Sequence, residues 1–372
     1  MNLREARGAV AGSLLVVRFP DRAAANRRLA GMSAAGRWAA RGREAGFGTV
    51  AISAPGAGGW PAETRADFRR AGVPGDVAIV DVAPAGARVM DGRFLPDAQG
   101  LARGDATGAI DLDRPVDAVR RILRATAKPS DGIISRSINR PISQRISAAL
   151  LLLIPRIKPS HMTLAVAAVA LVMMAALLSG TAAGLIWGGV LFQVASVLDG
   201  VDGEIARATY RSSPAGAVLD TRVDMLTNLG YFVGIAVSLT RLYGGHQAAV
   251  GGLAVLFALT GLGTTAWLLK RLDRPGSFDV IKLYYRDRYP GGWQRLVTET
   301  LVLMTSRDFF AFAFGVVIVC GAGWTVSWLL LGFTATYLYY VVAAVPGLLR
   351  QAKPRLKGIS ASPPSRRPNA AP

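Results

Sequence analysis

The sequence predicts an α-helical integral membrane domain of six transmembrane helices, preceded by a small soluble α/β domain. Three observations support this fold class. Of the 372 residues, 51% are hydrophobic, residues 159–198 include no Asp, Glu, Lys or Arg, and apolar strand-like runs alternate with helical stretches over residues 1–125. An uncharged run of this length is typical of membrane spans, and the alternation is typical of a parallel sheet.

Residues 1–125 form the predicted soluble domain. Its expected elements are strands at 13–17, 49–52 and 77–82 and helical stretches at 21–45 and 61–71. Because strands alternate with helices, we expect a parallel sheet. The glycine-rich segment 56–59 is not followed by the Lys-Ser/Thr pair of a phosphate-binding loop, so it predicts a plain turn.

The membrane domain is expected at residues 159–350. Its predicted helices are 162–178, 183–205, 216–239, 247–269 and two more in the uncharged run between Asp308 and Arg350. The first four are long enough to cross about 30 Å of hydrocarbon. A break at 321–323 leaves the fifth helix short, so we expect it to begin before Arg307 or to end a few residues later.

The charge distribution predicts the orientation. The net charge is +19, and Lys and Arg gather in the flanks and in the connections after the second and fourth helices. The positive-inside rule then predicts a multi-pass protein of the cell membrane, with both termini and the acidic segment on the cytoplasmic side. Residues 126–158 are expected to be a linker with a juxtamembrane amphipathic helix, and residues 351–372 a basic disordered tail.

Four aspartates stand where the first uncharged run ends. Asp199 and Asp202 are three residues apart and Asp220 and Asp224 are four apart, so each pair lies on one face of a helix. Four crowded carboxylates repel one another unless cations bind, and carboxylate oxygens suit Mg²⁺, Mn²⁺ or Ca²⁺. Interhelical ion pairs are the alternative, but they do not explain two carboxylates on one face of each helix. The cations of that alternative are Arg207, Arg211 and Arg222.

The residues between the aspartates favour a diphosphate ligand. Gly203 and Ala206 are small, so a ligand can approach the backbone closely. Arg207 offers a planar fork of donors that suits a phosphate.

The segment resembles the CDP-alcohol phosphotransferase (CDP-alcohol phosphatidyltransferase) family. The family motif D-x-x-D-G-x-x-A-R-x(8)-G-x-x-x-D-x-x-x-D is matched at every fixed position from Asp199 to Asp224. The resemblance implies a transferase that moves a phosphoalcohol from a CDP-alcohol to an acceptor hydroxyl and releases CMP. The implied metal ligands, for two Mg²⁺ or Mn²⁺ ions, are Asp199, Asp202, Asp220 and Asp224. Asp224 is also the implied general base. The implied CDP-binding residues are Gly203, Ala206, Arg207 and Gly216.

Two upstream segments extend the resemblance. Residues 110–118 are similar to the segment that closes sugar-phosphate nucleotidyltransferase domains, as fused in inositol-phosphate cytidylyltransferases. The glycine-rich signature of those enzymes is absent near the first strand, so we expect a degenerate nucleotidyltransferase-like domain without that activity. Residues 128–143 resemble the juxtamembrane region of fused dialkylether-type inositol-phosphate phosphotransferases, which implies that Arg136, Arg140 and Arg145 lie near anionic headgroups.

Residues 156–163 occupy the place of the family's T-P-N-x-x-T entry to the first membrane helix. Ser160 replaces the family Asn in this segment. Four cations at helix ends are candidates for binding an acceptor phosphate or for anchoring in the membrane: Lys270, Arg271, Arg307 and Arg350. The polar-aromatic loop 270–300, with Tyr284, Tyr285, Tyr289 and Trp293, predicts an interfacial belt, with a lid as the alternative.

The acceptor is expected to be an inositol-phosphate-like polar alcohol, which places the chain in phospholipid or polar headgroup biosynthesis. The alternative is a CDP-diacylglycerol-dependent phospholipid synthase with glycerol phosphate or serine as acceptor. A non-enzymatic membrane scaffold is a more distant alternative. The expected partners are both substrates and membrane lipids, without nucleic acid, and a homodimer is compatible with the sequence.

Overall fold

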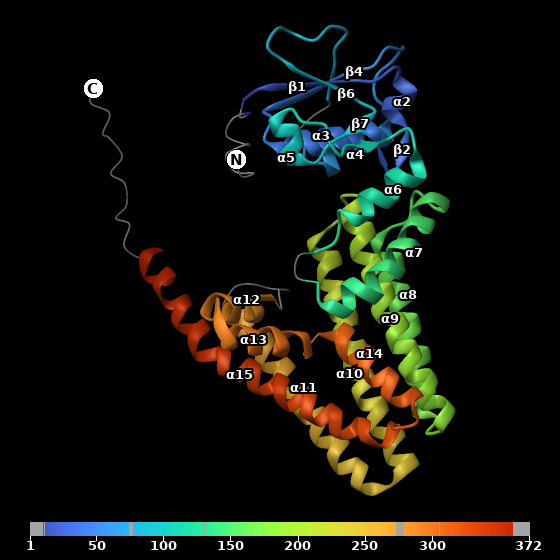
Figure 1. The fold of residues 1–372 in the computed structure, drawn as a ribbon, viewed down its shortest axis with the longest axis vertical. Helices are drawn as coiled ribbons and strands as arrows, with labels where there is room; N and C mark the ends of the chain where they lie inside the picture. Colours follow the sequence, from blue (N-terminus) through green and yellow to red (C-terminus); the bar gives the residue numbers. More distant parts are fainter. Residues whose placement is uncertain are drawn as a thin grey trace, which may run out of the picture. The chain divides into compact units, whose positions relative to one another are not determined.

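The computed structural model describes residues 10, 12–73, 77–128, 131–272, 279–304 and 306–359. The chain divides into two compact units, whose elements are labelled in Figure 1. The first unit consists of Met1–Asp131, Arg136–Ala165 and Val197–Gly216. The second consists of Gly132–Ser135, Val166–Ser196 and Ala217–Pro372.

The first unit contains the predicted parallel sheet. Strand β1 (Leu14–Arg18) lies between β4 (Thr49–Ser53) and β6 (Arg88–Asp91), and β5 (Ala78–Ile79) pairs with the outer side of β4. All these pairings are parallel. The strand predicted at 77–82 is therefore present but has only two paired residues.

One hydrophobic core holds the sheet to its helices. Leu15 of β1 and Ile52 of β4 share this core with Trp38 of helix α3 (Ala34–Ala45) and Phe68 of α4 (Ala62–Arg70). Trp38 is completely buried, and its indole N–H donates to the carbonyl of Gly92 at 2.8 Å. The buried polar atom of this large side chain is therefore satisfied.

The helix predicted over 21–45 is wrong in its middle. The structure has a short helix α2 (Arg22–Asn26) and a hairpin of β2 (Arg28–Leu29) and β3 (Met32–Ser33) before α3. Ala30 and Gly31 take left-handed backbone angles (φ 44° and 74°), which reverse the chain. Ser33 then caps α3, because its hydroxyl accepts a hydrogen bond from the Gly36 amide.

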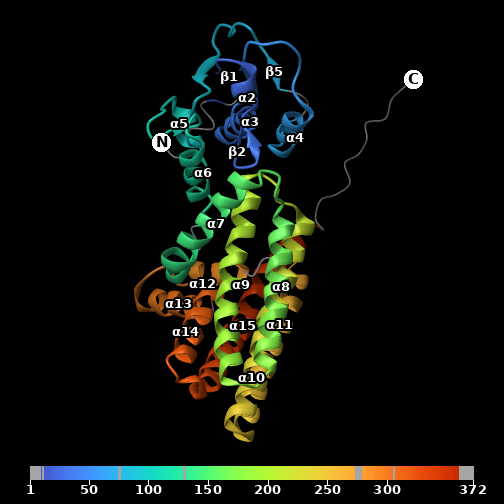
Figure 2. The same cartoon turned by 90° about the vertical axis from the view of Figure 1, so that its right-hand side faces the viewer.

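The first unit continues through smaller elements into a second core. These elements are β7 (Phe94–Leu95), α5 (Ala98–Arg103), β8 (Ile110–Asp111), α6 (Pro115–Arg124), the π-helical turn η1 (Ser135–Asn139) and α7 (Arg140–Leu153). Leu123 of α6 and Leu151 of α7 are buried together with Val201 and Ile205. Helices α6 and α7 lie side by side, as Figure 2 shows.

Five helices are long and apolar enough to cross a membrane in the part of the chain that the structure describes. They are α8 (Pro159–Leu178), α9 (Ala182–Ala208), α10 (Pro214–Tyr243), α11 (Gly245–Arg271) and the apolar part of α15 (Val326–Ile359). A sixth span arises if α13 (Gly292–Met304) and α14 (Arg307–Val319) count as one, bent by 66°. Helix α14 itself begins at Arg307 and ends at Val319, so the expectation of an earlier start or a later end is met only if α13 is counted as part of the same span. A 3₁₀ turn η2 (Gly323–Thr325) follows α14.

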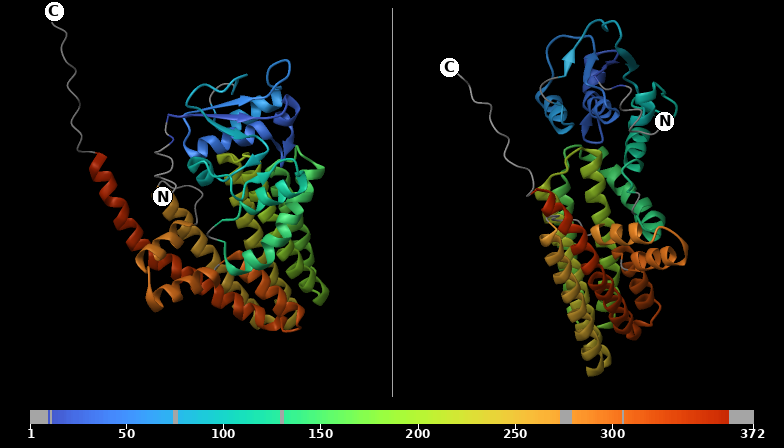
Figure 3. Two further views of the ribbon diagram at one scale, coloured as in Figure 1. Left: turned by 45° about the horizontal axis from the view of Figure 1, so that its top comes forward. Right: turned by 90° about the vertical axis from the view of Figure 1, so that its left-hand side faces the viewer.

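The second unit has an aromatic core. Phe192 and Tyr231 stack with ring centroids 3.8 Å apart, and Phe232 and Phe310 pack around them. Helices α11 and α15 lie side by side, as Figure 3 shows.

The segment predicted as a loop over 270–300 contains two helices, α12 (Asp279–Arg288) and α13. Tyr284 is buried, and Tyr285 stacks on Tyr340 of α15 with ring centroids 4.2 Å apart. The belt prediction is therefore wrong for these two tyrosines, because Tyr284 is a core residue and Tyr285 packs against the same core. Trp293 is 73% exposed, as expected for a residue of a belt.

The last helix extends into the predicted tail. Helix α15 continues to Ile359, so residues 351–359 are helical where disorder was expected. Residues 360–372, the remainder of the predicted tail, lie outside the described residues.

Candidate metal and phosphate site

The sequence motif lies on α9 and α10, which a short connection joins. Tyr210 takes a left-handed backbone conformation (φ 53°) just after the end of α9. Pro214 begins α10, and the Ser213 hydroxyl accepts a hydrogen bond from the Gly216 amide at 3.0 Å. Proline at the helix start and a capping serine are the local reasons that α10 begins here. Gly216 therefore has a structural role in the first turn of α10, where its amide donates to Ser213. Its role in CDP binding stays a prediction.

Three of the four aspartates form an acidic cluster. Asp199 of α9 and Asp220 and Asp224 of α10 each offer one carboxylate oxygen, and these oxygens lie within 4.8 Å of one another. All three side chains are partly exposed. Carboxylate oxygens at this spacing are suitable ligands for a hard divalent cation. The donor chemistry therefore fits the metal that the motif predicts.

Asp202 is held differently from the other aspartates. It is only 7% exposed, and its Oδ2 accepts a hydrogen bond from the hydroxyl of Thr163 on α8. Among the described residues it is not part of the three-carboxylate cluster. A carboxylate can bind a metal ion through one oxygen, and the hydrogen bond from Thr163 uses only Oδ2. Asp202 therefore remains a candidate metal ligand through Oδ1. Thr163 is a site residue that we did not predict, although it matches the last position of the family's helix-entry motif.

Gly203 makes room for Arg207. A Cβ atom at position 203 would lie 2.9 Å from Nη1 of Arg207, because the arginine folds back over the preceding turn. Its Nε donates to the carbonyl of Thr126 at 2.9 Å. Its Nη2 is buried and has no hydrogen-bond partner among the described residues. A buried donor without an acceptor is uncommon, and a phosphate oxygen would satisfy it. Ala206, the other small residue of the motif, is partly exposed on the same helix.

Asp224 has a basic partner that the sequence did not assign to it. Nη1 of Arg307, the first residue of α14, donates to Oδ1 of Asp224. The Arg307 guanidinium carbon also lies 5.6 Å from the centroid of the Phe192 ring. Arg307 was a candidate for binding an acceptor phosphate, and in the structure it orients a carboxylate of the acidic cluster.

A second buried carboxylate lies beside the motif. Glu204 is 0% exposed, and its two oxygens accept hydrogen bonds from Ser143 at 2.7 Å and Ser147 at 2.6 Å. Arg140 donates to Glu204 at 2.9 Å and also contacts both oxygens of Asp131. Burial alone would raise the pKa of Asp131, but the hydrogen bond and charge of Arg140 outweigh it and lower that pKa. Arg140 therefore belongs to a mostly buried network, so its guanidinium is not free on the surface as we expected.

Replacing Glu204 with Ala should destabilise the protein strongly. The change removes the acceptor of two buried hydroxyls and one of the two anionic partners of Arg140. Breaking a buried ion pair typically costs about 3–5 kcal/mol. The thermal unfolding midpoint in detergent checks this. The matched control is Glu63→Ala, which removes the ion pairs of a half-exposed carboxylate with Arg156 and Arg28 and should cost less than about 1 kcal/mol. Equal midpoints for both variants would contradict a stabilising role of Glu204.

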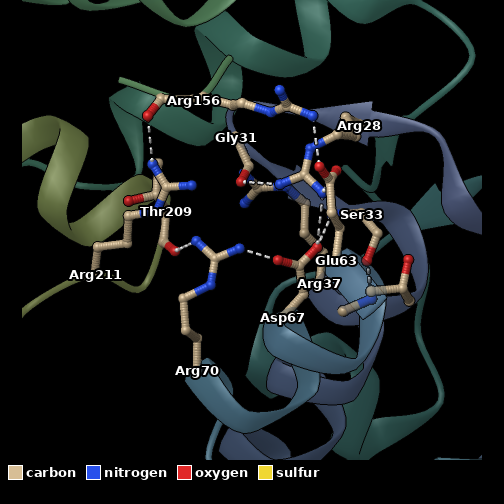
Figure 4. A network of polar contacts seen from close by, with 12 residues as sticks. Arg28, Gly31, Ser33, Arg37, Glu63, Asp67, Arg70, Arg156, Thr209 and Arg211 are labelled. Carbon is tan, nitrogen blue, oxygen red and sulfur yellow. Dashed lines mark hydrogen bonds and ion pairs between the residues drawn. The ribbon is translucent and has the colours of Figure 1, made fainter. Parts of the chain in front are cut away.

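Arginines of the α/β part cap the end of α9, as Figure 4 shows. The buried Arg37 donates from Nη2 to the carbonyl of Ala208 at 2.9 Å, and Arg70 donates to that of Thr209 at 3.2 Å. Burial lowers the pKa of each arginine to about 10, so both remain charged at neutral pH. Asp67 accepts a hydrogen bond from the Ser33 amide at 2.7 Å and pairs with Arg70. Cations at a helix C-terminus stabilise it through the helix dipole, so this network fixes the end of the motif helix.

Comparison with known proteins agrees with this geometry. The family model for CDP-alcohol phosphatidyltransferase matches residues 156–335. A protein from Thermococcus kodakarensis named "Bifunctional IPC transferase and DIPP synthase" is 40% identical over 124 residues, which cover 32% of this chain and 27% of the relative. Proteins of the same name from Aquifex aeolicus (37% over 134 residues; 35% and 30% covered) and Rubrobacter xylanophilus (36% over 183 residues; 43% and 41% covered) are also similar. The chain thus spans between about a quarter and two fifths of the length of these curated relatives.

The fold and the site together define a multi-pass helical membrane protein with an acidic cluster at the end of its second span, and the carboxylate oxygens of this cluster suit a divalent cation. Residues 156–335 are a domain of the CDP-alcohol phosphatidyltransferase family. The family recognised from the motif is therefore confirmed for the membrane domain.

Proposed function

We propose that the protein is a CDP-alcohol phosphotransferase. It transfers a phosphoalcohol from a CDP-alcohol to an acceptor hydroxyl and releases CMP. The observation that carries this proposal is the cluster of Asp199, Asp220 and Asp224 within the matched family domain. The placement of this site on the cytoplasmic side rests on the basic flanks and connections.

In this proposal the acidic cluster binds the metal ions and α9 binds the nucleotide. Asp199, Asp202, Asp220 and Asp224 hold one or two Mg²⁺ or Mn²⁺ ions. When bound, such ions neutralise negative charge on the diphosphate and on the departing CMP. The Nη2 donor of Arg207 supplies a hydrogen bond to a phosphate oxygen, and Gly203 and Ala206 let the nucleotide approach the helix.

Asp224 is proposed as the general base. The acceptor hydroxyl must lose its proton as its oxygen attacks the β-phosphorus, and a carboxylate at the edge of the cluster can accept that proton. The ion pair with Arg307 fixes one oxygen of Asp224, which supports an oriented base with the other oxygen toward the acceptor. The proton and CMP then leave separately.

A product assay tests the function. Purified protein in proteoliposomes receives Mg²⁺, a labelled CDP-alcohol and a panel of acceptors, and both CMP and the labelled product are measured. We expect stoichiometric CMP release and product formation with one donor–acceptor pair. Absence of CMP release with every CDP-alcohol tested, in protein that unfolds cooperatively, would contradict the proposal and favour a scaffold.

The acceptor is proposed to be an inositol-phosphate-like polar alcohol. The names of the similar proteins and the resemblance of residues 128–143 support this choice. The second candidate is a phospholipid synthase that uses CDP-diacylglycerol with glycerol phosphate or serine. The same assay separates them, since each acceptor gives a product of different headgroup mass.

Replacing Gly203 with Ala should weaken nucleotide binding without unfolding the protein. The added Cβ would meet the flexible end of Arg207, so the guanidinium moves while the helix remains intact. Loss of one charge-assisted hydrogen bond predicts about a tenfold higher Kd for the CDP-alcohol. The measurement is calorimetric titration, and Gly252→Ala, a glycine of α11 with open space around it, is the control. An unchanged Kd would remove Arg207 from the nucleotide site.

The soluble α/β domain should make no CDP-alcohol. The glycine-rich signature of nucleotidyltransferases is absent near β1, and the glycine-rich segment 56–59 is a turn whose Gly58 carbonyl accepts a hydrogen bond from Nη1 of Arg22 at 2.8 Å. We propose that this domain acts as a structural cap on α9. Incubating the full chain with CTP and sugar phosphates should yield no CDP-alcohol, and its detection would overturn the prediction.

A further inference from the structure

A basic groove lies between α6 and α7 in the first unit, and none of its lining residues belongs to the acidic cluster. Its volume is about 670 Å³, within the usual range of small-molecule sites. The cations that line it are Arg120 and Arg124 of α6 and Arg145 of α7. Its apolar lining includes Val116, Ala148 and Leu152. The groove therefore combines three positive charges with an apolar floor.

The helical spacing explains why these side chains converge. Positions 116, 120 and 124 repeat every four residues and form one stripe of α6, and positions 145, 148 and 152 form one stripe of α7. The opposite face of α7 is fixed by Ser143 and Ser147, which bind the buried Glu204. The groove-facing stripe of α7 is consequently held in place without help from a ligand.

The three groove arginines lack anionic partners. None of Arg120, Arg124 and Arg145 makes a hydrogen bond or an ion pair among the described residues, and all three are exposed. The next arginine, Arg121, by contrast donates to the carbonyls of Gly108 and Ala109. Two like charges four residues apart destabilise a helix, so an anion between α6 and α7 would relieve their repulsion.

The position of the groove indicates a lipid. Helix α7 ends at Leu153, and only five residues separate it from Pro159, where the first candidate membrane span, α8, begins. The end of α7 exposes Leu152, Leu153 and Ile154. Exposed apolar residues beside a span are typical of a helix at the membrane interface. A soluble phosphate ester would use the arginines but leave the apolar lining without a partner.

We propose that this groove binds an anionic membrane phospholipid, with its phosphate among the three arginines and the start of an acyl chain along Leu152. The bound lipid links α6 to the juxtamembrane helix α7 and holds both at the bilayer surface. This site is separate from the proposed transferase centre and does not depend on that activity.

Native mass spectrometry of the delipidated full-length protein tests the proposal. Phosphatidylglycerol, phosphatidylcholine with the same acyl chains, and glycerol 3-phosphate are titrated separately. The wild type should retain phosphatidylglycerol in preference to phosphatidylcholine. Each arginine near an anionic phosphate strengthens binding about fivefold, so Arg120→Gln, Arg124→Gln and Arg145→Gln combined should weaken it on the order of 100-fold. Replacing the same three with Lys should restore most of the affinity, because the charges remain.

The matched control removes three exposed arginines elsewhere, with Arg65→Gln, Arg69→Gln and Arg103→Gln, and should bind the lipid as the wild type does. Equal loss in the control would assign the effect to net charge and overturn the site. Equal binding of phosphatidylcholine, or displacement by glycerol 3-phosphate at the same concentration as the lipid, would also overturn it, the latter in favour of a soluble phosphate ester.

Discussion

Replacing Asp199, Asp202 or Asp220 with Asn is expected to lower turnover at least about 100-fold while the protein still inserts and folds. Each change removes a charged ligand from the proposed metal site and keeps the volume of the side chain. Loss of a group that only supports a metal ligand already costs about 10–100-fold, so loss of a ligand itself should cost at least as much. CMP release in proteoliposomes at saturating Mg²⁺ is the measurement, and Asp287→Asn, an exposed aspartate of α12, is the control.

Asp202 is the most informative of the three. Asp202 accepts a hydrogen bond from Thr163, which is compatible with a purely structural role. Among the described residues, Asp202 is also not part of the three-carboxylate cluster. Thr163→Val removes only that hydrogen bond and should reduce turnover less than Asp202→Asn does. Near-normal turnover of Asp202→Asn at saturating Mg²⁺ would mean that this residue is not a ligand. The same result at Asp199 or Asp220 would reject the metal site.

Asp224→Asn should separate a base from a ligand. If Asp224 accepts the proton of the acceptor hydroxyl, turnover falls by about 10²–10⁴ while the affinities for CDP-alcohol and Mg²⁺ change little. Asp220→Asn should instead weaken metal binding and turnover together. Parallel titrations of CDP-alcohol and Mg²⁺ against both variants decide between these outcomes. Equal losses of affinity would leave Asp224 with the role of metal ligand alone and assign the role of base to another residue.

The ion pair with Arg307 provides a second test of the base. Arg307→Gln keeps a hydrogen-bond donor beside Asp224 but removes the charge that orients it. We expect a smaller loss of turnover than in Asp224→Asn and a shift of the pH–rate profile, since the charge next to the base has changed. A lower affinity for the acceptor with an unchanged pH profile would instead return Arg307 to the role of binding the acceptor phosphate.

The regular elements could be predicted because their signals are local. Uncharged runs placed the membrane helices, and short β-branched runs placed β1 and β4. The hairpin at Ala30 and Gly31 was missed because an alanine- and arginine-rich stretch has high helix propensity on both sides of it. The bend between α13 and α14, and the burial of Tyr284 against α15, depend on packing between distant segments.

The sequence by itself determined the membrane class, the family of residues 156–335 and the pairing of aspartates on helix faces, because all of these follow from spacing along one chain segment. Only the tertiary structure decided which side chains pair with the carboxylates of the motif region. In the structure Thr163 donates a hydrogen bond to Asp202, and Arg307 donates to Asp224. Arg140 and two serines donate to the buried Glu204. Such partners are far apart in sequence, and a buried charge selects them by proximity and by the need to be compensated, which no local pattern encodes.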